Sequence, residues 1–540
     1  MKPYSTINLF GFLLLFSFSS AQIPPEIELQ NTIGGSEDDM LYSIQPTNDG
    51  GFIIGGYSYS GSSGDKTENN KGENDYWIVK TDASLNIQWQ NTIGGSSFDF
   101  ISSIQQTTDG GYIIGGTSNS NISGDKTENN LGDPWESFDY WIVKTDSVGN
   151  VQWDNTIGGS GDDELNSIQQ TPDGGYILAG HSVSNISGDK TDDSKGGDDF
   201  WLLKTDTWGN IEWQKTIGGS NFDYLYSIDQ TNDGGYILGG NSNSNISGDK
   251  TENTNGFQDY WIVKTDAVGN IVWQNTIGGN EGDYLYGIYQ TNDGGYIMGG
   301  NSPSDLSGDK TENSNGLKDY WIVKTDTIGN IQWQNTIGGD YYENFHCIWP
   351  TYDGGYLVGG KSLSGISGDK TENNLGGGKI WIVKTDSYGN IQWDNTIGGS
   401  GYEELYSISQ STDGAYVLGG ISTSNISGDK TENNIGGQDY WIIKTTPELA
   451  TDAYEPYFKE NQISVYPNPA TSLISISYFI TTSSTLTIND LLGNELKEIT
   501  LSKSLRNYQE SIHNLPAGAY FIILRQSGKT IAAEKLIIIE

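Results

Sequence analysis

The 540-residue sequence has a single cysteine, Cys347, so no disulfide within the chain can stabilise it. It has 28 Lys and Arg against 69 Asp and Glu, and the formal net charge of −41 argues against nucleic acid or an anionic membrane as a partner. Beyond residue 21, no apolar run approaches the roughly 18 residues that a membrane span requires. We therefore expect the mature chain to be soluble or held at a surface, and to be stabilised by packing alone.

Residues 1–21 have the features of an export signal. One Lys is followed by the apolar run NLFGFLLLFSF, and the small residues SSA precede Gln22. This leader predicts a secreted protein or one displayed at the outer cell surface.

The remaining sequence is dominated by a repeat. The tryptophan of the motif WIVKT, or of a close variant, recurs every 60 residues apart from one four-residue insertion before the second copy. A fixed period of this length indicates a repeat architecture. The seven copies begin at Trp77, Trp141, Trp201, Trp261, Trp321, Trp381 and Trp441.

Each repeat contains four runs that predict β-strands. In the first copy, Leu41–Thr47 and Phe52–Gly56 flank an Asp-Gly turn, which is a strong hairpin signal. After a long polar loop, Tyr76–Asp82 is apolar on both faces, and a Gly-Asn turn leads to a fourth run that alternates like a half-exposed outer strand. Leu85 replaces the glycine of this turn, so we expect a looser turn there.

The two ends of the repeat region complement each other. A lone strand of the fourth type, Glu26–Gly35, precedes the first copy, while the last copy ends after its third strand, Asp439–Thr446. Pairing these two strands closes a ring and removes two exposed edges. The sequence therefore predicts an all-β protein in which residues 22–446 form a seven-bladed β-propeller closed by its N-terminal strand.

The segment between the third and fourth strands, VKTDSVGNVQW in the second copy, resembles blades of the pyrroloquinoline-quinone-type propellers, in which a Trp and a D-x-x-G turn recur. The resemblance covers only this short part of each copy and implies the fold. It does not bring the quinone with it, because those dehydrogenases often have adjacent cysteines beside the cofactor.

After a linker at residues 447–462, the composition changes. Residues 463–540 contain YPNPA (Tyr466–Ala470), the turn LLGNE (Leu491–Glu495), LPAGAYF (Leu515–Phe521) and a closing KLIII strand, with period-2 runs that predict an Ig-like β-sandwich. This order of motifs resembles the type A sorting domain of the type IX secretion system of Bacteroidota. The resemblance implies Sec export, passage of the outer membrane by contact with the secretion machinery, and removal of the module.

The connections between strands divide into two sets that lie on opposite faces of the ring. The DGG and D-x-x-G-N turns are short, whereas the long loop and the link GGSxxD share the other face. Because binding sites favour long loops on a rigid frame, we expect function on the long-loop face.

Each link carries an acid at a fixed offset after TIGG. Since the link leads to the innermost strand, we expect these carboxylates to surround the mouth of the central channel. They are Asp39, Asp99, Asp163, Asp223, Asp283, Glu343 and Glu403.

The long loop carries the motif GDKT in every copy. Closely spaced oxygen ligands suit calcium, the one cofactor that the sequence suggests, although the spacing is not that of an EF-hand. Asp and Thr also pin loops through local turns, and both interpretations stay open. The aspartates are Asp65, Asp125, Asp189, Asp249, Asp309, Asp369 and Asp429.

Departures from the repeat point to ligand-binding positions. Exposed aromatic residues beside polar groups suit a sugar or a peptide, although drift at tolerant positions explains them equally well. The insertion and the sixth repeat supply Trp135, Glu136, Tyr341, Tyr342, His346, Trp349 and Lys379.

No Ser–His–Asp order, HExxH motif or phosphate loop occurs in the sequence. We therefore expect a non-enzymatic scaffold that binds a glycan or an extracellular protein through the long-loop face. The alternative is a glycoside hydrolase or polysaccharide lyase that uses the channel-mouth acids. Hydrolysis needs two carboxylates roughly 5–9 Å apart, and a near-symmetric ring distinguishes no such pair.

Overall fold

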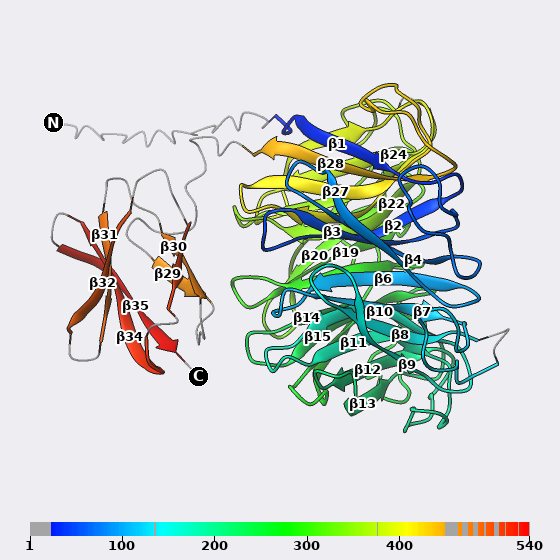
Figure 1. Ribbon diagram of the computed structural model, residues 1–540, viewed down its shortest axis with the longest axis horizontal. Coiled ribbons are helices and arrows are strands. Elements are labelled where there is room, and N and C mark those ends of the chain that lie inside the picture. The colour runs from blue at the N-terminus through cyan, green and yellow to red at the C-terminus, as the bar shows by residue number, and fades with distance from the viewer. Residues whose placement is uncertain are drawn as a thin grey trace, which may run out of the picture. The chain divides into compact units, whose positions relative to one another are not determined.

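The computed structural model describes residues 23–133, 137–374 and 376–448, and in the C-terminal module residues 463–466, 473–478, 484–490, 493–501, 507–512, 515–526 and 529–538. The chain divides into two compact units, Met1–Leu449 and Ala450–Glu540 (Figure 1). The predicted export signal and most of the predicted linker lie outside the described residues.

The first unit consists of seven four-stranded antiparallel sheets, which are the blades. The inner strands are β2 (Asp39–Pro46), β6 (Asp99–Gln106), β10 (Asp163–Gln170), β14 (Asp223–Gln230), β18 (Tyr284–Gln290), β22 (Glu343–Pro350) and β26 (Glu403–Gln410). The second strands are β3 (Phe52–Ser58), β7 (Tyr112–Ser118), β11 (Tyr176–Ser182), β15 (Tyr236–Ser242), β19 (Tyr296–Ser302), β23 (Tyr356–Ser362) and β27 (Ala415–Ser422).

The third strands are β4 (Asp75–Thr81), β8 (Asp139–Thr145), β12 (Asp199–Thr205), β16 (Asp259–Thr265), β20 (Asp319–Thr325), β24 (Lys379–Thr385) and β28 (Asp439–Pro447). The outer strands are β5 (Ile87–Ile93), β9 (Val151–Ile157), β13 (Ile211–Ile217), β17 (Ile271–Ile277), β21 (Ile331–Ile337) and β25 (Ile391–Ile397). The seventh outer strand is β1 (Ile27–Ile33), which comes from the other end of the repeat region.

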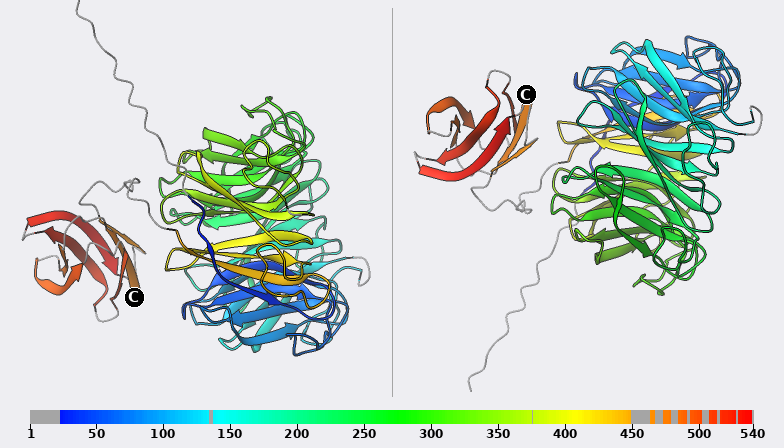
Figure 2. Two further views of the ribbon diagram at one scale, coloured as in Figure 1. Left: turned by 90° about the horizontal axis from the view of Figure 1, so that it is seen from above. Right: turned by 90° about the horizontal axis from the view of Figure 1, so that it is seen from below.

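The ring is closed by the first strand. β1 pairs antiparallel with β28, from Ile27 opposite Thr445 to Ile33 opposite Tyr440 (Figures 1 and 2). The inner strands of the first and last blades also meet, and the N–H of Ile44 donates to Ser407 Oγ at 3.2 Å. The predicted seven-bladed propeller with this closure is therefore confirmed, and β28 is not left as an open edge.

Neighbouring blades are joined by the aromatic residues of the third strands. Trp77 and its six counterparts are fully buried, because both faces of these strands are covered by adjacent sheets. The preceding residue is a tyrosine in five blades and reaches across the junction: the hydroxyl of Tyr76 donates to the carbonyl of Trp141 at 3.2 Å, and that of Tyr440 donates to the carbonyl of Trp77 at 3.3 Å. The repeated tryptophans are thus structural.

The turn at Leu85 is not looser than its glycine counterparts, contrary to the prediction. Leu85 adopts a left-handed backbone with φ 65°, and its N–H donates to the carbonyl of Asp82 at 3.1 Å, as Gly149 does to Asp146. The side chain is buried in the core beside Trp77, and this packing offsets the cost of the backbone conformation.

The C-terminal unit contains two sheets. One has the order β29 (Ile463–Tyr466), β30 (Leu473–Tyr478), β33 (Asn507–Ser511), and the other has the order β32 (Glu495–Leu501), β31 (Ser484–Asn489), β34 (Gly518–Gln526), β35 (Lys529–Ile538). Alternate residues such as Ile474, Ile488 and Ile522 are fully buried in a core shared by both sheets. This is the predicted β-sandwich arrangement.

Candidate ligand site at the central channel

The acids predicted to surround the channel mouth are buried inside the blades. Asp39 is 0 % exposed; its Oδ2 accepts the N–H of Gly35 at 2.6 Å and the hydroxyl of Ser60 at 3.1 Å. Its counterparts in the other six blades are also fully buried. The prediction of an open ring of carboxylates was therefore wrong, because these side chains lie on the blade side of the inner strand.

The cavity inside the channel is lined by residues three to six positions after these acids, such as Ser102, Gln105 and Trp349. Tyr286, His346 and Tyr406 line the cavity inside the channel. The positions one and three residues after each buried acid differ from blade to blade more than the positions directly beside them in the inner strand. The first set is Met40, Phe100, Glu164, Tyr224, Tyr284, Asn344 and Glu404, and the second is Tyr42, Ser102, Asn166, Tyr226, Tyr286, His346 and Tyr406.

Five rings of the second set form an aromatic belt around most of the channel. The belt is Tyr42, Tyr406, His346, Tyr286 and Tyr226, in spatial order. The distances between successive ring centroids are 5.0, 4.7, 6.4 and 5.4 Å. The belt is interrupted at the second and third blades, where Ser102 and Asn166 stand in its place.

A cavity of about 330 Å³ lies inside the channel. Its wall on one side is polar, with Ser102, Gln105 and Gln169, whereas Tyr289 and Trp349 stand on the other. Trp349 Nε1 is buried and has no hydrogen-bond partner among the described residues. The volume and the mixed lining are those of a small-ligand site.

Glu404 lies at the centre of a polar cluster at the edge of the belt. Its Oε1 is 2.8 Å from His346 Nε2 and 3.0 Å from Lys361 Nζ. Its Oε2 accepts the hydroxyls of Tyr402 and, at 3.2 Å, Tyr406. Burial raises the pKa of Glu404, but His346, Tyr402 and Lys361 outweigh burial and hold it at about 2. The carboxylate is therefore ionised under all ordinary conditions.

A second cluster lies on the third blade. His181 is buried, and its Nε2 is 3.5 Å from Glu164 Oε2 and 4.0 Å from Asp198 Oδ1. The hydrogen bond from His181 lowers the pKa of Glu164, whereas burial raises the pKa of Asp198. The ring of Tyr224 packs edge-on against His181 at 5.0 Å. In a seven-membered ring, the third and seventh blades face each other across the channel.

Aromatic side chains also gather at the long-loop end of the channel, which lies to the right in Figure 1. Phe100 contacts Tyr57 at 4.9 Å and stacks on Phe98 at 6.1 Å. In the sixth blade Tyr341 and Tyr342 are 48 % and 39 % exposed, with ring centroids 4.9 Å apart. This mouth is therefore rich in rings that solvent can reach.

The structure places the ligand-binding residues predicted from departures in the repeat in different environments. Trp135 and Glu136 lie outside the described residues. Tyr341 and Tyr342 are exposed at the mouth, His346 is in the belt, and Trp349 is in the cavity wall. Lys379 is 1 % exposed and forms an ion pair with Glu403 at 2.7 Å, so the prediction that it contacts a ligand was wrong.

The aspartates of the GDKT motif pin the long loops. The N–H of Asp65 donates to the carbonyl of Gly34 at 2.8 Å, and Asp65 Oδ2 accepts the N–H of Gly34 at 3.2 Å. The same carboxylate contact recurs in Asp125, Asp189, Asp249, Asp309, Asp369 and Asp429. Within the described part of the chain, no group of three or more His, Cys, Asp or Glu side chains is arranged to hold a metal. These contacts agree with the loop-pinning interpretation.

The lysine of the same motif is buried against the repeated tryptophan. Lys126 Nζ lies 5.1 Å from the centre of the Trp141 ring, and Lys250 Nζ lies 5.3 Å from that of Trp261. Burial lowers the pKa of Lys126 and of Lys250 to about 8. These lysines are thus part of the blade interior.

Sequence reasoning missed Glu164, Glu404 and Tyr406. The sequence did contain a signal for Glu164 and Glu404, because the position after each buried acid varies while the positions beside it repeat. In the seven blades this position is Met, Phe, Glu, Tyr, Tyr, Asn and Glu. A variable position in an otherwise constant repeat is where a single ligand site can be built.

The comparisons with known proteins give one family match and several similar structures. Residues 464–540 match the secretion system C-terminal sorting domain. A protein of unknown function from Dyadobacter fermentans is similar in structure, with 9 % identity and a TM-score of 0.40, over 78 % of this chain and 100 % of that one. The Neurospora crassa Pan2 WD40 domain is 10 % identical with a TM-score of 0.41, over 80 % and 99 % of the two chains. No curated protein matches the sequence.

The seven closed blades and the family match at residues 464–540 define an exported β-propeller protein. Its C-terminal module is a type IX secretion sorting domain, which directs export to the cell surface or the extracellular space and implies contact with the secretion machinery. Among the described residues there is no helix long and apolar enough to cross a membrane.

Proposed function

We propose that the protein is an extracellular binding scaffold that recognises a glycan at the long-loop mouth of its central channel. The observation that carries this proposal is the concentration of blade-to-blade differences at channel-facing positions. A residue that builds a blade has to repeat, whereas a residue that contacts one ligand does not. At these positions the chain places aromatic rings beside carboxylates and amides, and Lys361 of β23 lies against Glu404.

This chemistry suits a sugar. The C–H faces of a sugar ring pack on aromatic rings, and its hydroxyl groups need both hydrogen-bond donors and acceptors. The belt offers the rings, Glu164 offers acceptors, and Lys361 and Gln105 offer donors. Glu404 holds Lys361 and His346 in place. A protein ligand remains the alternative occupant of the same mouth.

Catalysis of glycan cleavage is less well supported. The seven acids of the inner strands are buried, so they cannot reach a substrate. Glu404 has a pKa of about 2, which makes it a poor proton donor near neutral pH. Glu164 and Glu404 belong to separate clusters on the third and seventh blades.

A glycan array on the full-length protein, with reducing-sugar release measured on the same polymers, tests the proposal. We expect binding without turnover. Glu404→Gln removes the charge that holds Lys361 and His346, and a hydrogen bond to a charged group contributes about 1.5–3 kcal/mol, so this variant should weaken binding about tenfold or more. Tyr342→Ala removes an exposed ring at the mouth and should also weaken binding. Tyr388→Ala, on an exposed turn of the opposite face, is the matched control and should bind normally.

Each other outcome has a clear meaning. Capture of an extracellular protein, lost in Tyr342→Ala and not in Tyr388→Ala, would replace the glycan by a protein ligand. Release of sugar ends that Glu404→Gln abolishes would establish an enzyme. Binding that neither channel variant affects would overturn the channel as the site.

A further inference from the structure

Pairs of buried carboxylates lie at the junctions between neighbouring blades. In each pair, the acid that begins a third strand stands beside the acid that begins the inner strand of the next blade. Both residues are 0 % exposed in every pair. The six pairs are Asp75 with Asp99, Asp139 with Asp163, Asp199 with Asp223, Asp259 with Asp283, Asp319 with Glu343, and Asp439 with Asp39.

The two carboxylates of a pair flank the same Gly-Gly segment. At the first junction, Asp99 Oδ2 accepts the N–H of Gly95 at 2.7 Å, and a β-carbon at Gly94 would collide with Asp75 Oδ1. Asp75 Oδ2 accepts the N–H of Lys71 at 2.5 Å. The remaining oxygens, Asp75 Oδ1 and Asp99 Oδ1, are both buried without a hydrogen bond.

The same oxygens are unpartnered at the other junctions. Oδ1 has no hydrogen-bond partner in all six third-strand aspartates and in the five inner-strand aspartates. A serine of the second strand, such as Ser118 beside Asp99, lies close enough to lower the pKa of the carboxyl without a standard hydrogen bond to Oδ1. Glu343 differs, because Ser362 and Ser364 both donate to its Oε1. A buried polar atom without a hydrogen-bond partner costs folding free energy. Eleven such oxygen atoms at the blade junctions therefore require an explanation.

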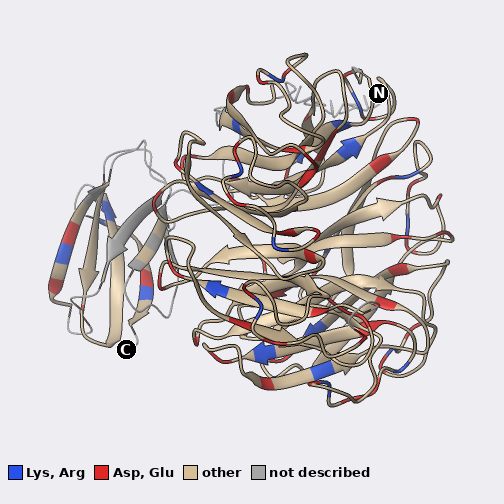
Figure 3. Cartoon of the chain, turned by 45° about the vertical axis from the view of Figure 1, so that its right-hand side comes forward, with Lys and Arg blue, Asp and Glu red and all other residues tan. Residues whose placement is uncertain are grey.

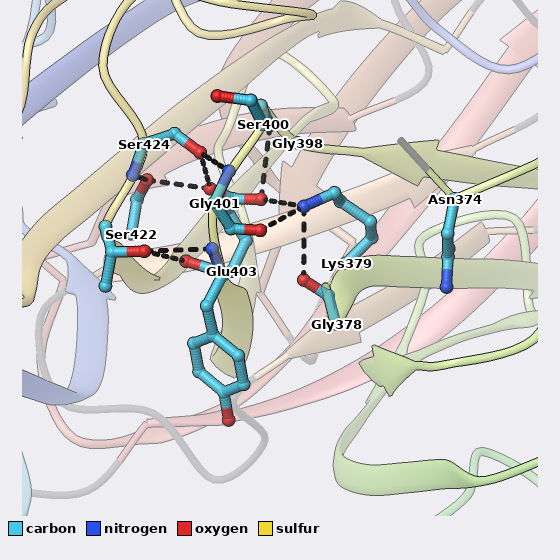
Figure 4. Close-up of polar contacts among 12 residues, drawn as sticks. Asn374, Gly378, Lys379, Gly398, Ser400, Gly401, Glu403, Ser422 and Ser424 are labelled. Carbon is cyan, nitrogen blue, oxygen red and sulfur yellow. Dashed lines mark hydrogen bonds and ion pairs between the residues drawn. The ribbon is translucent and has the colours of Figure 1, made fainter. Parts of the chain in front are cut away.

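The seventh junction supplies that explanation. Lys379 replaces the third-strand aspartate, and its Nζ is 2.7 Å from Glu403 Oε2, 2.5 Å from the carbonyl of Gly401 and 3.4 Å from that of Gly378 (Figure 4). A positive charge thus sits among a carboxylate and backbone carbonyls. The repeat places the corresponding carbonyls, Ser97 and Asn74 at the first junction, at equivalent positions in the other blades.

The charges at the other six junctions also favour a cation. Glu403 and Lys379 are neutral together, whereas each acid pair carries two negative charges when ionised. Among the described residues, no lysine, arginine or histidine lies within the 4.0 Å ion-pair limit of these twelve carboxylates. The buried GDKT lysines, such as Lys126 near Asp99 and Asp139, lie further away and offset only part of the negative charge. Figure 3 shows acidic and basic positions interspersed over the blades.

We propose that each of the six acid pairs binds one calcium ion between two neighbouring blades, and that Lys379 takes the place of the ion at the seventh junction. Calcium accepts carboxylate and backbone carbonyl oxygens, which are the donors present here. Burial and the neighbouring Asp283 raise the pKa of Asp259 to about 7, against the lowering effects of Asn255 and Lys250. These sites are separate from the GDKT aspartates, which are bonded to backbone.

The test is a count of bound calcium in the full-length protein after chelation and readdition, by calorimetry and elemental analysis. We expect six equivalents and a melting temperature that rises with calcium concentration. Asp75→Lys copies the seventh junction and should bind one equivalent fewer. The double variant Lys379→Asp, Glu403→Asp recreates a pair and should bind one more. Asp65→Asn, in the GDKT motif, is the control and should leave the count unchanged.

Other results would overturn the proposal. Protein that binds no calcium, and whose stability responds only to pH, would show that each pair shares a proton. A melting temperature that rises with sodium as well as with calcium would assign the site to a monovalent ion. Loss of calcium in Asp65→Asn with no loss in Asp75→Lys would move the ions to the long loops. The count on the unaltered protein is decisive even if a variant fails to fold.

Discussion

Replacement of Asp259 by asparagine is expected to stabilise the calcium-free protein at pH 8. Burial, and then the neighbouring Asp283, raises the pKa of Asp259 to about 7, although the N–H of Asn255 lowers it. In the unfolded chain the pKa of an aspartate is about 3.9. Because the folded-state pKa is the higher one, the stability that this group contributes is fully present below about pH 3.9 and is lost as the pH rises through about 7.

The magnitude follows from this difference. About three pKa units correspond to about 4 kcal/mol at 1.36 kcal/mol per unit, and this is the cost that the folded protein carries at pH 8. At pH 5 the cost is about 1.5 kcal/mol, since only the unfolded chain has then lost its proton. Asparagine keeps an oxygen for the N–H of Asn255, now 2.5 Å from Asp259 Oδ2, and brings an N–H toward Asp283 Oδ1.

Denaturant unfolding of the full-length protein with a chelator, at pH 5 and pH 8, measures this effect. Asp259→Asn should exceed the unaltered protein by several kcal/mol at pH 8 and by less at pH 5. Asp266→Asn is the control: Asn270 lowers the pKa of this exposed turn carboxyl, so its loss should weaken the fold at pH 8. If Asp259→Asn is less stable than the unaltered protein at pH 8, the carboxylate pair is not a source of strain. In saturating calcium the unaltered protein should be more stable than Asp259→Asn, because the variant lacks one carboxylate of the proposed site.

Three further changes test the packing. Deletion of residues 23–33 removes β1 and leaves β28 as an open edge, so the melting temperature should fall and light scattering should rise; an unchanged melting temperature would contradict the closure. Trp201→Ala should cost about 3–5 kcal/mol in urea unfolding, since the side chain is fully buried, and a cost under about 1 kcal/mol would refute its structural role. Leu85→Gly relieves about 1–2 kcal/mol of backbone strain but removes a buried side chain worth about 2–5 kcal/mol, so the variant should be less stable, and a gain in stability would mean that the packing is minor.

Sequence alone determined the blades and their number. The blades follow from local features that recur in every repeat. These are the Asp-Gly turns and the alternation of the outer strands, and they return with a period of 60 residues. The orphan strand at Ile27–Ile33 and the missing outer strand after Asp439–Pro447 also predicted the closure. The motifs of residues 464–540 identified the sorting module for the same reason, since they are continuous in the chain.

The candidate site depended on a distinction that the sequence did not resolve. Asp39 and Met40 are adjacent, yet the first is buried in the blade and the second belongs to the channel positions. A step of one residue along a strand turns a side chain to the other face, so an error of one position moved the predicted acids from the blade interior to the channel mouth.

Only the tertiary structure decided which polar groups meet across blade boundaries. Lys379 and Glu403 belong to different blades, as do His346 and Glu404, and the repeat gives no sign of either contact. Local hydrogen bonding within a blade is fixed by short-range sequence, whereas the oxygen atoms left without a partner depend on how neighbouring sheets pack against each other. That lateral packing exists only once the ring has closed.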